Sequence, residues 1–299
     1  MKKKYNDVSF FSKILSSVLK HTSIKKNYIN EEDTKKMIKD LSKKKYETPK
    51  KVGLLLEEYD KAEVYSYNGS FNKPKDKIII YMHGGSYVEE AMTFQFKFAM
   101  KIAKKCDATL IVPIYPLAPK NTYKDTYDLM NDLYDNVLKL NKKIIFLGDS
   151  AGGGFCLSFS MYLKKLGKKQ PSNILVLSPW LDLTLSNPSI RELERFDSSC
   201  SIAGNVYTGK LWAGELDVKN YLVSPIYGNF DGLPRITIST GEFDIMKPDI
   251  VKLSKMLDDM KIEHDYIEFK GQCHDFAVQP TKEGNLLIND FVKVINDEV

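Results

Sequence analysis

The chain has 299 residues, of which 28% are charged and 43% hydrophobic, and its net charge is +5. This composition is typical of a soluble globular protein and excludes a disordered, collagen-like or disulfide-rich chain. The four cysteines (Cys106, Cys156, Cys200 and Cys273) form no CxxC pair, and no apolar run reaches membrane-spanning length, so we expect a cytoplasmic protein without a disulfide framework.

The first 50 residues form a basic arm, with 14 lysines against 6 acidic residues. Residues 8–21 fit a helix whose apolar face carries Val8, Phe11, Ile14, Leu15, Val18 and Leu19. A second, polar helix is predicted near 31–45, and Pro49 ends the arm. We expect the apolar face to pack on residues 182–232. Contact of the basic helix with a membrane is the alternative that we do not favour, and no nucleic-acid partner is expected.

From about residue 60 the pattern alternates between strands and helices. Strands are predicted at 63–67, 78–82, 109–114, 144–148, 174–178, 235–240 and 264–269. Helices are predicted at 92–105, 122–140, 151–166, 249–260 and 283–297. Continuous apolar strands alternating with helices predict an α/β fold with a mostly parallel, doubly wound sheet over residues 51–299. Residues 182–232 show no strand pattern and are predicted to be a functional insertion.

A Gly-x-Ser-x-Gly turn follows the strand at 144–148, in the order Gly148, Asp149, Ser150, Ala151, Gly152. A sharp turn from a strand into a helix exposes the central hydroxyl, which makes Ser150 the candidate nucleophile. The alternative is an ordinary glycine-rich turn.

A serine nucleophile needs a base, and the chain has four histidines: His21, His83, His264 and His274. Catalytic groups of an open parallel sheet gather beyond the carboxyl ends of its strands. His274 follows the last predicted strand and is the candidate base, whereas His264 opens that strand. A surface-loop role is the alternative for His274.

The base needs a carboxylate partner, and Asp244 lies just past the strand at 235–240. Glu242 is its main rival. Asp249 fits the first turn of a helix, and Asp275 is too close in sequence to the base to be favoured.

An acyl-transfer site also needs donors for the oxyanion. The loop His83-Gly84-Gly85-Ser86 follows a strand, and we assign Gly84, Gly85, Ser86 and Ala151 to the oxyanion hole, with the N–H groups of the last three as donors. His83 is expected to hold this loop. A metal or phosphate site is the alternative, but no second ligand cluster or P-loop lysine supports it.

These motifs resemble those of the hormone-sensitive-lipase-like (GDXG) esterases of the α/β-hydrolase superfamily over roughly residues 60–297. The matching segments are 83–86 (His-Gly-Gly-Gly in the family), 148–153, 115–119, 178–183 and 232–234. Two departures are Ser86, where the family has glycine, and Pro116, where it has arginine.

The resemblance implies a Ser150–His274–Asp244 triad that hydrolyses small short-chain esters without a cofactor. It also implies that the arm and the insertion form a cap over the site. Two alternatives share this fold: a deacetylase or amidase acting on a metabolite, and a ligand-binding protein without activity.

Overall fold

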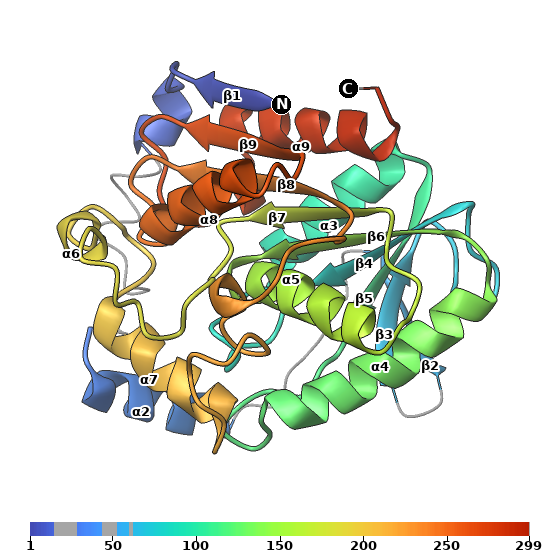
Figure 1. The fold of residues 1–299 in the computed structure, drawn as a ribbon, viewed down its shortest axis with the longest axis horizontal. Helices are drawn as coiled ribbons and strands as arrows, with labels where there is room; N and C mark the ends of the chain where they lie inside the picture. The colour runs from blue at the N-terminus through green and yellow to red at the C-terminus, as the bar shows by residue number, and fades with distance from the viewer. Residues whose placement is uncertain (15–28, 44–52, 60–61, 299) are drawn as a thin grey trace.

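In the part of the chain that the structure describes, a mostly parallel sheet of nine strands forms the centre of the fold (Figure 1). The computed structural model describes residues 1–14, 29–43, 53–59 and 62–298. The strands are β1 (Lys2–Tyr5), β2 (Leu55–Tyr59), β3 (Ala62–Tyr67), β4 (Lys77–Met82), β5 (Ala108–Pro113), β6 (Lys143–Asp149), β7 (Asn173–Leu177), β8 (Arg235–Gly241) and β9 (His264–Phe269). The helices are α2 (Glu31–Leu41), α3 (Thr93–Lys105), α4 (Tyr123–Lys139), α5 (Ser150–Lys165), α6 (Ile190–Leu193), α7 (Ile202–Ala213), α8 (Lys247–Asp259) and α9 (Lys282–Ile295).

The strand order is β1-β9-β8-β7-β6-β4-β5-β3-β2. Every neighbouring pair from β1 to β5 is parallel, while β3 and β2 are added antiparallel. The predicted α/β fold with a mostly parallel sheet is therefore confirmed. Because parallel strands all end at one edge, the segments that follow β4, β6, β8 and β9 meet there.

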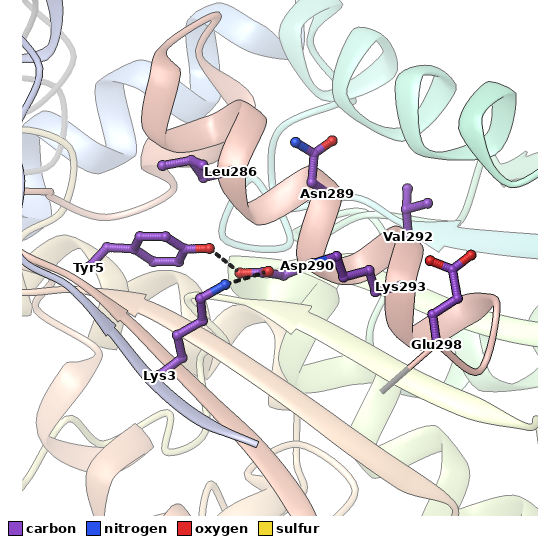
Figure 2. Close-up of a pocket in the computed structure, with 8 residues that line it drawn as sticks. All are labelled: Lys3, Tyr5, Leu286, Asn289, Asp290, Val292, Lys293 and Glu298. Atoms are coloured by element: carbon purple, nitrogen blue, oxygen red, sulfur yellow. Dashed lines mark hydrogen bonds and ion pairs between the residues drawn. The ribbon is translucent and has the colours of Figure 1, made fainter.

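The sequence did not predict β1 or β2. β1 consists of Lys2, Lys3, Lys4 and Tyr5, which have no apolar pattern, and it forms by pairing with β9 in the register Lys2↔Tyr266. Figure 2 shows Lys3 and the Tyr5 hydroxyl both directed at Asp290 of α9, each 2.7 Å from that carboxylate. The open cleft beside them has a volume of about 460 Å³, and no predicted site residue lines it.

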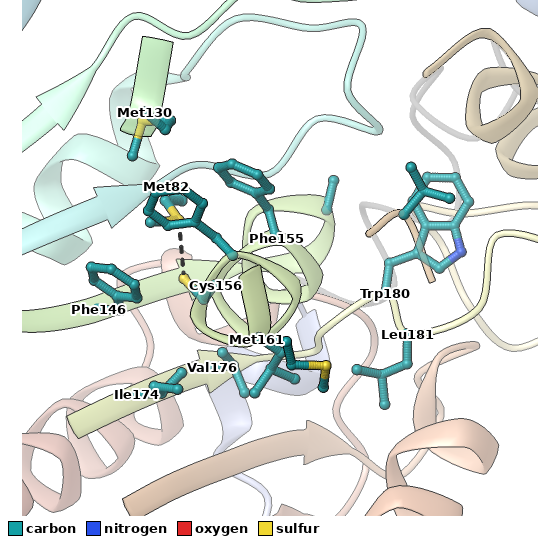
Figure 3. Close-up of a cluster of buried hydrophobic side chains, with 14 of the residues drawn as sticks. Met82, Met130, Phe146, Phe155, Cys156, Met161, Ile174, Val176, Trp180 and Leu181 are labelled. Carbon is teal, nitrogen blue, oxygen red and sulfur yellow. Dashed lines mark hydrogen bonds between the residues drawn. The ribbon is translucent and has the colours of Figure 1, made fainter. Parts of the chain in front are cut away.

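Two apolar layers cover the sheet. On one face, Ile78, Ile80 and Met82 of β4 belong to a core completed by α4, α5 and α8, and on the other Ile79 and Tyr81 pack with α3 and α9. Figure 3 shows the first core around α5, where Cys156 lies 3.5 Å from the sulfur of Met82. Burial on both faces explains why the central strands are continuous apolar runs.

The start of the predicted first helix turns a different face to the protein than expected. Ser12 is 2% exposed and its hydroxyl donates to Glu283 of α9 (2.6 Å), as does the Ser9 N–H (2.6 Å). Phe11 and Ile14 of the predicted apolar face are 54% and 46% exposed. The cause is the Glu283 carboxylate, which gains several donors from the serines. Leu15, Val18, Leu19, His21 and Pro49 lie outside the described residues.

The insertion 182–232 contains helices α6 and α7 and no strand, as the sequence pattern predicts. Ile38 of α2, in the arm, packs with Val88, Ala118 and α7 residues Tyr207 and Leu211. Helix α2 of the arm is thus in contact with the insertion, close to the segment that follows β4, whereas Ser9 and Ser12 contact α9.

Candidate active site

Ser150 stands at the junction where β6 ends and α5 begins. Its φ is +50°, a left-handed conformation that is strained for a residue with a Cβ and is often found at functional sites. A Cβ on Gly152 would collide with the carbonyl oxygen of Met82, and one on Gly148 with the carbonyl of Gly152. Both glycines are therefore required for the turn to fit between the strands.

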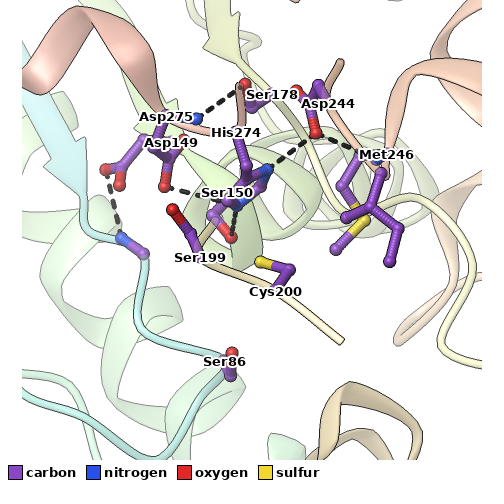
Figure 4. Close-up of polar contacts among 12 residues, drawn as sticks. Ser86, Asp149, Ser150, Ser178, Ser199, Cys200, Asp244, Met246, His274 and Asp275 are labelled. Atoms are coloured by element: carbon purple, nitrogen blue, oxygen red, sulfur yellow. Dashed lines mark hydrogen bonds and ion pairs between the residues drawn. The ribbon is translucent and has the colours of Figure 1, made fainter. Parts of the chain in front are cut away.

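His274 lies between Ser150 and Asp244 in one hydrogen-bonded chain (Figure 4). Its Nε2 is 2.8 Å from the Ser150 Oγ, and its Nδ1 is 2.9 Å from the Asp244 Oδ1. Ser150 is 4% exposed, His274 7% and Asp244 0%. Such an arrangement can transfer the serine proton to the ring while the carboxylate holds the ring in the right tautomer.

Asp244 is fixed by donors besides the histidine. The Met246 N–H donates to Oδ1 (2.9 Å), and the Thr240 hydroxyl donates to Oδ2 (3.2 Å). The rival carboxylates are engaged elsewhere: Glu242 accepts the N–H of Gly271, and Asp249 accepts from the side chain of Asn187.

The other described histidines have structural partners. His264 lies 2.8 Å from the Ser254 hydroxyl through Nε2 and 3.0 Å from the carbonyl of Ile262 through Nδ1. His83 is 1% exposed, and its Nδ1 lies 2.7 Å from the carbonyl of Gly84. Burial lowers the pKa of His83, so this ring is held neutral in the loop that it supports.

The charges around His274 favour its imidazolium form. Burial alone would lower the pKa of His274, but the carboxylates of Asp275 and Asp244 outweigh it and raise that pKa well above its ordinary value. Burial likewise pulls the pKa of Asp244 upward, but the charge and hydrogen bond of His274 leave it below its ordinary value. The site is thus suited to hold the imidazolium that forms when the ring takes a proton.

Two further carboxylates at the site were not assigned a role from the sequence. Asp275 has its Oδ2 3.4 Å from the Nε2 of His274, on the side of the ring away from Asp244, and burial raises its pKa well above the ordinary value. Asp197, from the insertion, accepts the N–H of Ser199 (2.8 Å) and that of Ile245 (2.9 Å). Asp275 was considered only as a rival acid, and no pattern in the insertion marked Asp197.

Asp197, Asp244 and His274 present donor atoms within 4.8 Å of one another, as a metal site would. Hydrogen bonds account for this arrangement without an ion, because Asp197 accepts the backbone N–H groups of Ser199, Cys200 and Ile245, and Asp244 faces the ring nitrogen.

Asp149 connects the candidate nucleophile to the loop after β4. It is fully buried and accepts from the Tyr81 hydroxyl, from Gly84 N–H (3.1 Å) and from the side chain of Gln95 (2.7 Å). The Gly84 N–H is therefore directed at Asp149 and holds the loop, and the oxyanion donors assigned from the sequence stay a prediction. Gly85, Ser86 and Ala151 have no N–H acceptor in the part of the chain that the structure describes.

Comparisons with known proteins identify the family and the fold. Residues 79–278 match the family model described as the alpha/beta hydrolase fold. An esterase from Acinetobacter venetianus is 28% identical over 215 residues, which are 68% of this chain and 68% of that protein. A triacylglycerol lipase from Mycobacterium tuberculosis is 27% identical over 208 residues, covering 69% of this chain and 43% of that protein.

Among solved structures, a hormone-sensitive lipase from a metagenome library shares the fold with a TM-score of 0.80 at 23% identity, covering 96% of this chain and 98% of that one. No helix in the described ranges is both long and apolar enough to span a bilayer.

Proposed function

Because this chain belongs to the α/β-hydrolase family, whose model it matches over residues 79–278, we propose that it is a serine esterase acting on small carboxylic esters. The observation that carries the proposal is the hydrogen-bonded chain from Ser150 through His274 to Asp244, with distances of 2.8 Å and 2.9 Å. The hydrolases to which the chain is similar include an esterase and a lipase.

In the acylation step, Ser150 Oγ attacks the ester carbonyl carbon while its proton moves to His274 Nε2. The negative charge that develops on the carbonyl oxygen is stabilised by the N–H groups of Gly85, Ser86 and Ala151. The tetrahedral intermediate then breaks its bond to the alcohol oxygen, which receives the proton from His274 and leaves as the alcohol.

In the deacylation step, water takes the place of the alcohol. His274 accepts a proton from the water as its oxygen attacks the acyl carbon, and the proton passes to Ser150 Oγ as the carboxylic acid is released. Asp244 keeps the Nδ1 proton directed at itself throughout, so that Nε2 is available for both transfers. This sequence needs no cofactor.

We assign short acyl groups to the substrate. Ser150 is nearly closed off from solvent, and large aromatic rings pack close by, with Tyr87 stacked on Trp212 at 4.2 Å and on Trp180 at 5.8 Å. The packing of α2 on α7 supports a domain organisation in which the arm and the insertion together form a cap over the site. The four cysteines are free thiols, which supports a cytoplasmic location.

The test is hydrolysis of p-nitrophenyl esters of increasing acyl length by the full chain, compared with Ser150→Ala and with Ser158→Ala. Ser158 is a matched control, because it is also a buried serine of α5 and its hydroxyl donates to the carbonyl of Phe155 instead of to a residue of the proposed triad. We expect Ser150→Ala to lose activity by a factor on the order of 10⁴ or more and Ser158→Ala to keep it.

A serine-directed organophosphate should label Ser150 alone. A folded Ser150→Ala protein that keeps more than roughly a few per cent of the wild-type activity would rule out Ser150 as the nucleophile. A wild-type protein that binds esters without turnover would instead support the non-catalytic alternative.

A further inference from the structure

The loop after β4 contains three consecutive residues with positive φ, and two of them are not glycine. Gly85 has φ +125°, Ser86 +52° and Tyr87 +62°. A residue with a Cβ is disfavoured in the left-handed region, so this conformation at Ser86 and Tyr87 requires contacts that hold it. The direction of the Ser86 N–H depends on these backbone angles.

Helix α7 of the insertion supplies contacts to both residues. The Asn205 side-chain amide donates to the Ser86 hydroxyl at 3.5 Å, and the two residues are 1% and 8% exposed. The ring of Trp212 is stacked on that of Tyr87 with an interplanar angle of 2°. The Tyr87 hydroxyl in turn donates to the carbonyl of Ala151 (2.8 Å), beside the candidate nucleophile.

The position of Asn205 is itself well defined. α7 begins after Ser201, whose hydroxyl accepts the N–H of Gly204 (3.2 Å) as an N-cap, and this places Asn205 in the first turn of the helix. A buried amide side chain is costly unless it is hydrogen-bonded, and Ser86 Oγ is the partner that the structure gives to its NH₂ group.

We propose that Asn205 is a positioning residue for the oxyanion hole: by bonding the Ser86 hydroxyl, it holds Ser86 in the left-handed conformation that sets the direction of its N–H. The insertion then does more than cover the substrate, because it maintains the group that stabilises the transition state. This inference rests on the proposed esterase function.

The effect belongs to the chemical step, because an oxyanion donor acts more strongly on the transition state than on the bound ester. We expect Asn205→Ala to lower kcat by about ten- to a hundredfold with KM changed by less than about twofold, as for a small displacement of a catalytic group. The affinity for a trifluoromethyl ketone, which adds to Ser150 and places an oxyanion in the hole, should fall by a similar factor.

Ser86→Gly provides the rescue. Glycine adopts positive φ without a Cβ penalty and keeps the N–H, so it should not depend on Asn205. In the Ser86→Gly background, adding Asn205→Ala should therefore change kcat by less than about threefold. Thr208→Val is the matched control, because Thr208 is a fully buried polar residue of the same helix whose hydroxyl donates to the helix carbonyl of Asn205 rather than to the loop.

A wild-type-like kcat for Asn205→Ala would overturn the inference, and so would a loss that persists undiminished in the Ser86→Gly background. If Asn205→Ala does not fold, as judged by its thermal transition, Ser86→Ala removes the same hydrogen bond from the loop side and should show the same loss of kcat. An inactive wild-type protein would contradict the proposed function itself, whereas an active wild type with an unaffected Asn205→Ala contradicts only the role of Asn205.

Discussion

Replacement of Asp244 by asparagine tests the role of the acid, and the structure indicates how the variant should behave. The Met246 N–H lies 2.9 Å from Oδ1 and requires an acceptor there, while the Thr240 hydroxyl next to Oδ2 can also accept a hydrogen bond. The asparagine oxygen should therefore occupy the Oδ1 position, with its NH₂ group facing Thr240. His274 would keep its Nδ1 proton directed at an oxygen, and only the negative charge would be lost.

The size of the loss follows from that charge. Two unit charges about 4 Å apart interact by about 4 kcal/mol at an effective dielectric constant of about 20. Both His274 and Asp244 are buried, so salt screens this interaction little. Since 1.36 kcal/mol corresponds to a factor of ten, kcat should fall by about 10³. If the NH₂ group instead faced His274, the ring would change tautomer and the loss would be about 10⁴.

The measurement is kcat for a short-chain p-nitrophenyl ester at saturating substrate, with Asp249→Asn as control. Asp249 is a buried carboxylate in the first turn of α8 that bonds Asn187 and not His274, so its variant should lose less than about threefold. A loss below about tenfold for Asp244→Asn would refute the assigned role, and a loss of about 10⁴ would refute the orientation argued from Met246.

Two further variants test the carboxylates of Asp275, beside His274, and of Asp265, in β9. Asp275→Asn removes a carboxylate 3.4 Å from the Nε2 of His274 that helps to raise the pKa of that ring. Because the active enzyme needs the neutral ring, the acid limb of the pH profile of kcat/KM should move to lower pH. An acid limb that stays in place would show that Asp275 carries no charge in that pH range. Asp265→Asn should lower the free energy of unfolding by about 2 kcal/mol at pH 7, because this buried carboxylate bonds the guanidinium of Arg235 (2.8 Å and 2.9 Å) and the hydroxyl of Thr237 (2.8 Å). Burial raises the pKa of Asp265, but these bonds outweigh it and leave that pKa below its ordinary value, so the contribution of Asp265 to stability is complete above about pH 4 and is lost as the pH falls through the folded pKa. Urea denaturation at pH 7 and at low pH should therefore show that the difference in the free energy of unfolding between wild type and variant shrinks in acid. A difference that does not change with pH would contradict an origin in the charge of Asp265.

The parts of the fold that the sequence predicts are those whose signal is local. The central strands are continuous apolar runs because helices cover both faces, and the candidate triad stands out because Ser150, Asp244 and His274 each follow a strand. β1 has no such signal, since three lysines become a strand only through β9, far along the chain.

The site shows the same division between local and long-range information. Asp197 and Asn205 lie in an insertion without periodicity, and their importance depends on contacts with Ile245 and Ser86. The hydrogen bond from the Gly84 N–H to Asp149 could not be predicted from the sequence, because it depends on where the side chain of Asp149 points.

The pairing of β1 with β9 also has a consequence for synthesis on the ribosome. Lys2–Tyr5 are synthesised before their partners in β9, because Lys2 pairs with Tyr266, which lies more than 200 positions later in the chain. At typical elongation rates this delay is on the order of tens of seconds. During this delay β1 has no strand to pair with. Three of its four residues are lysines, and charged side chains on an unpaired strand disfavour pairing with other nascent chains. Its docking should therefore be among the last events of folding, closing an edge of β9 that would otherwise be open to aggregation.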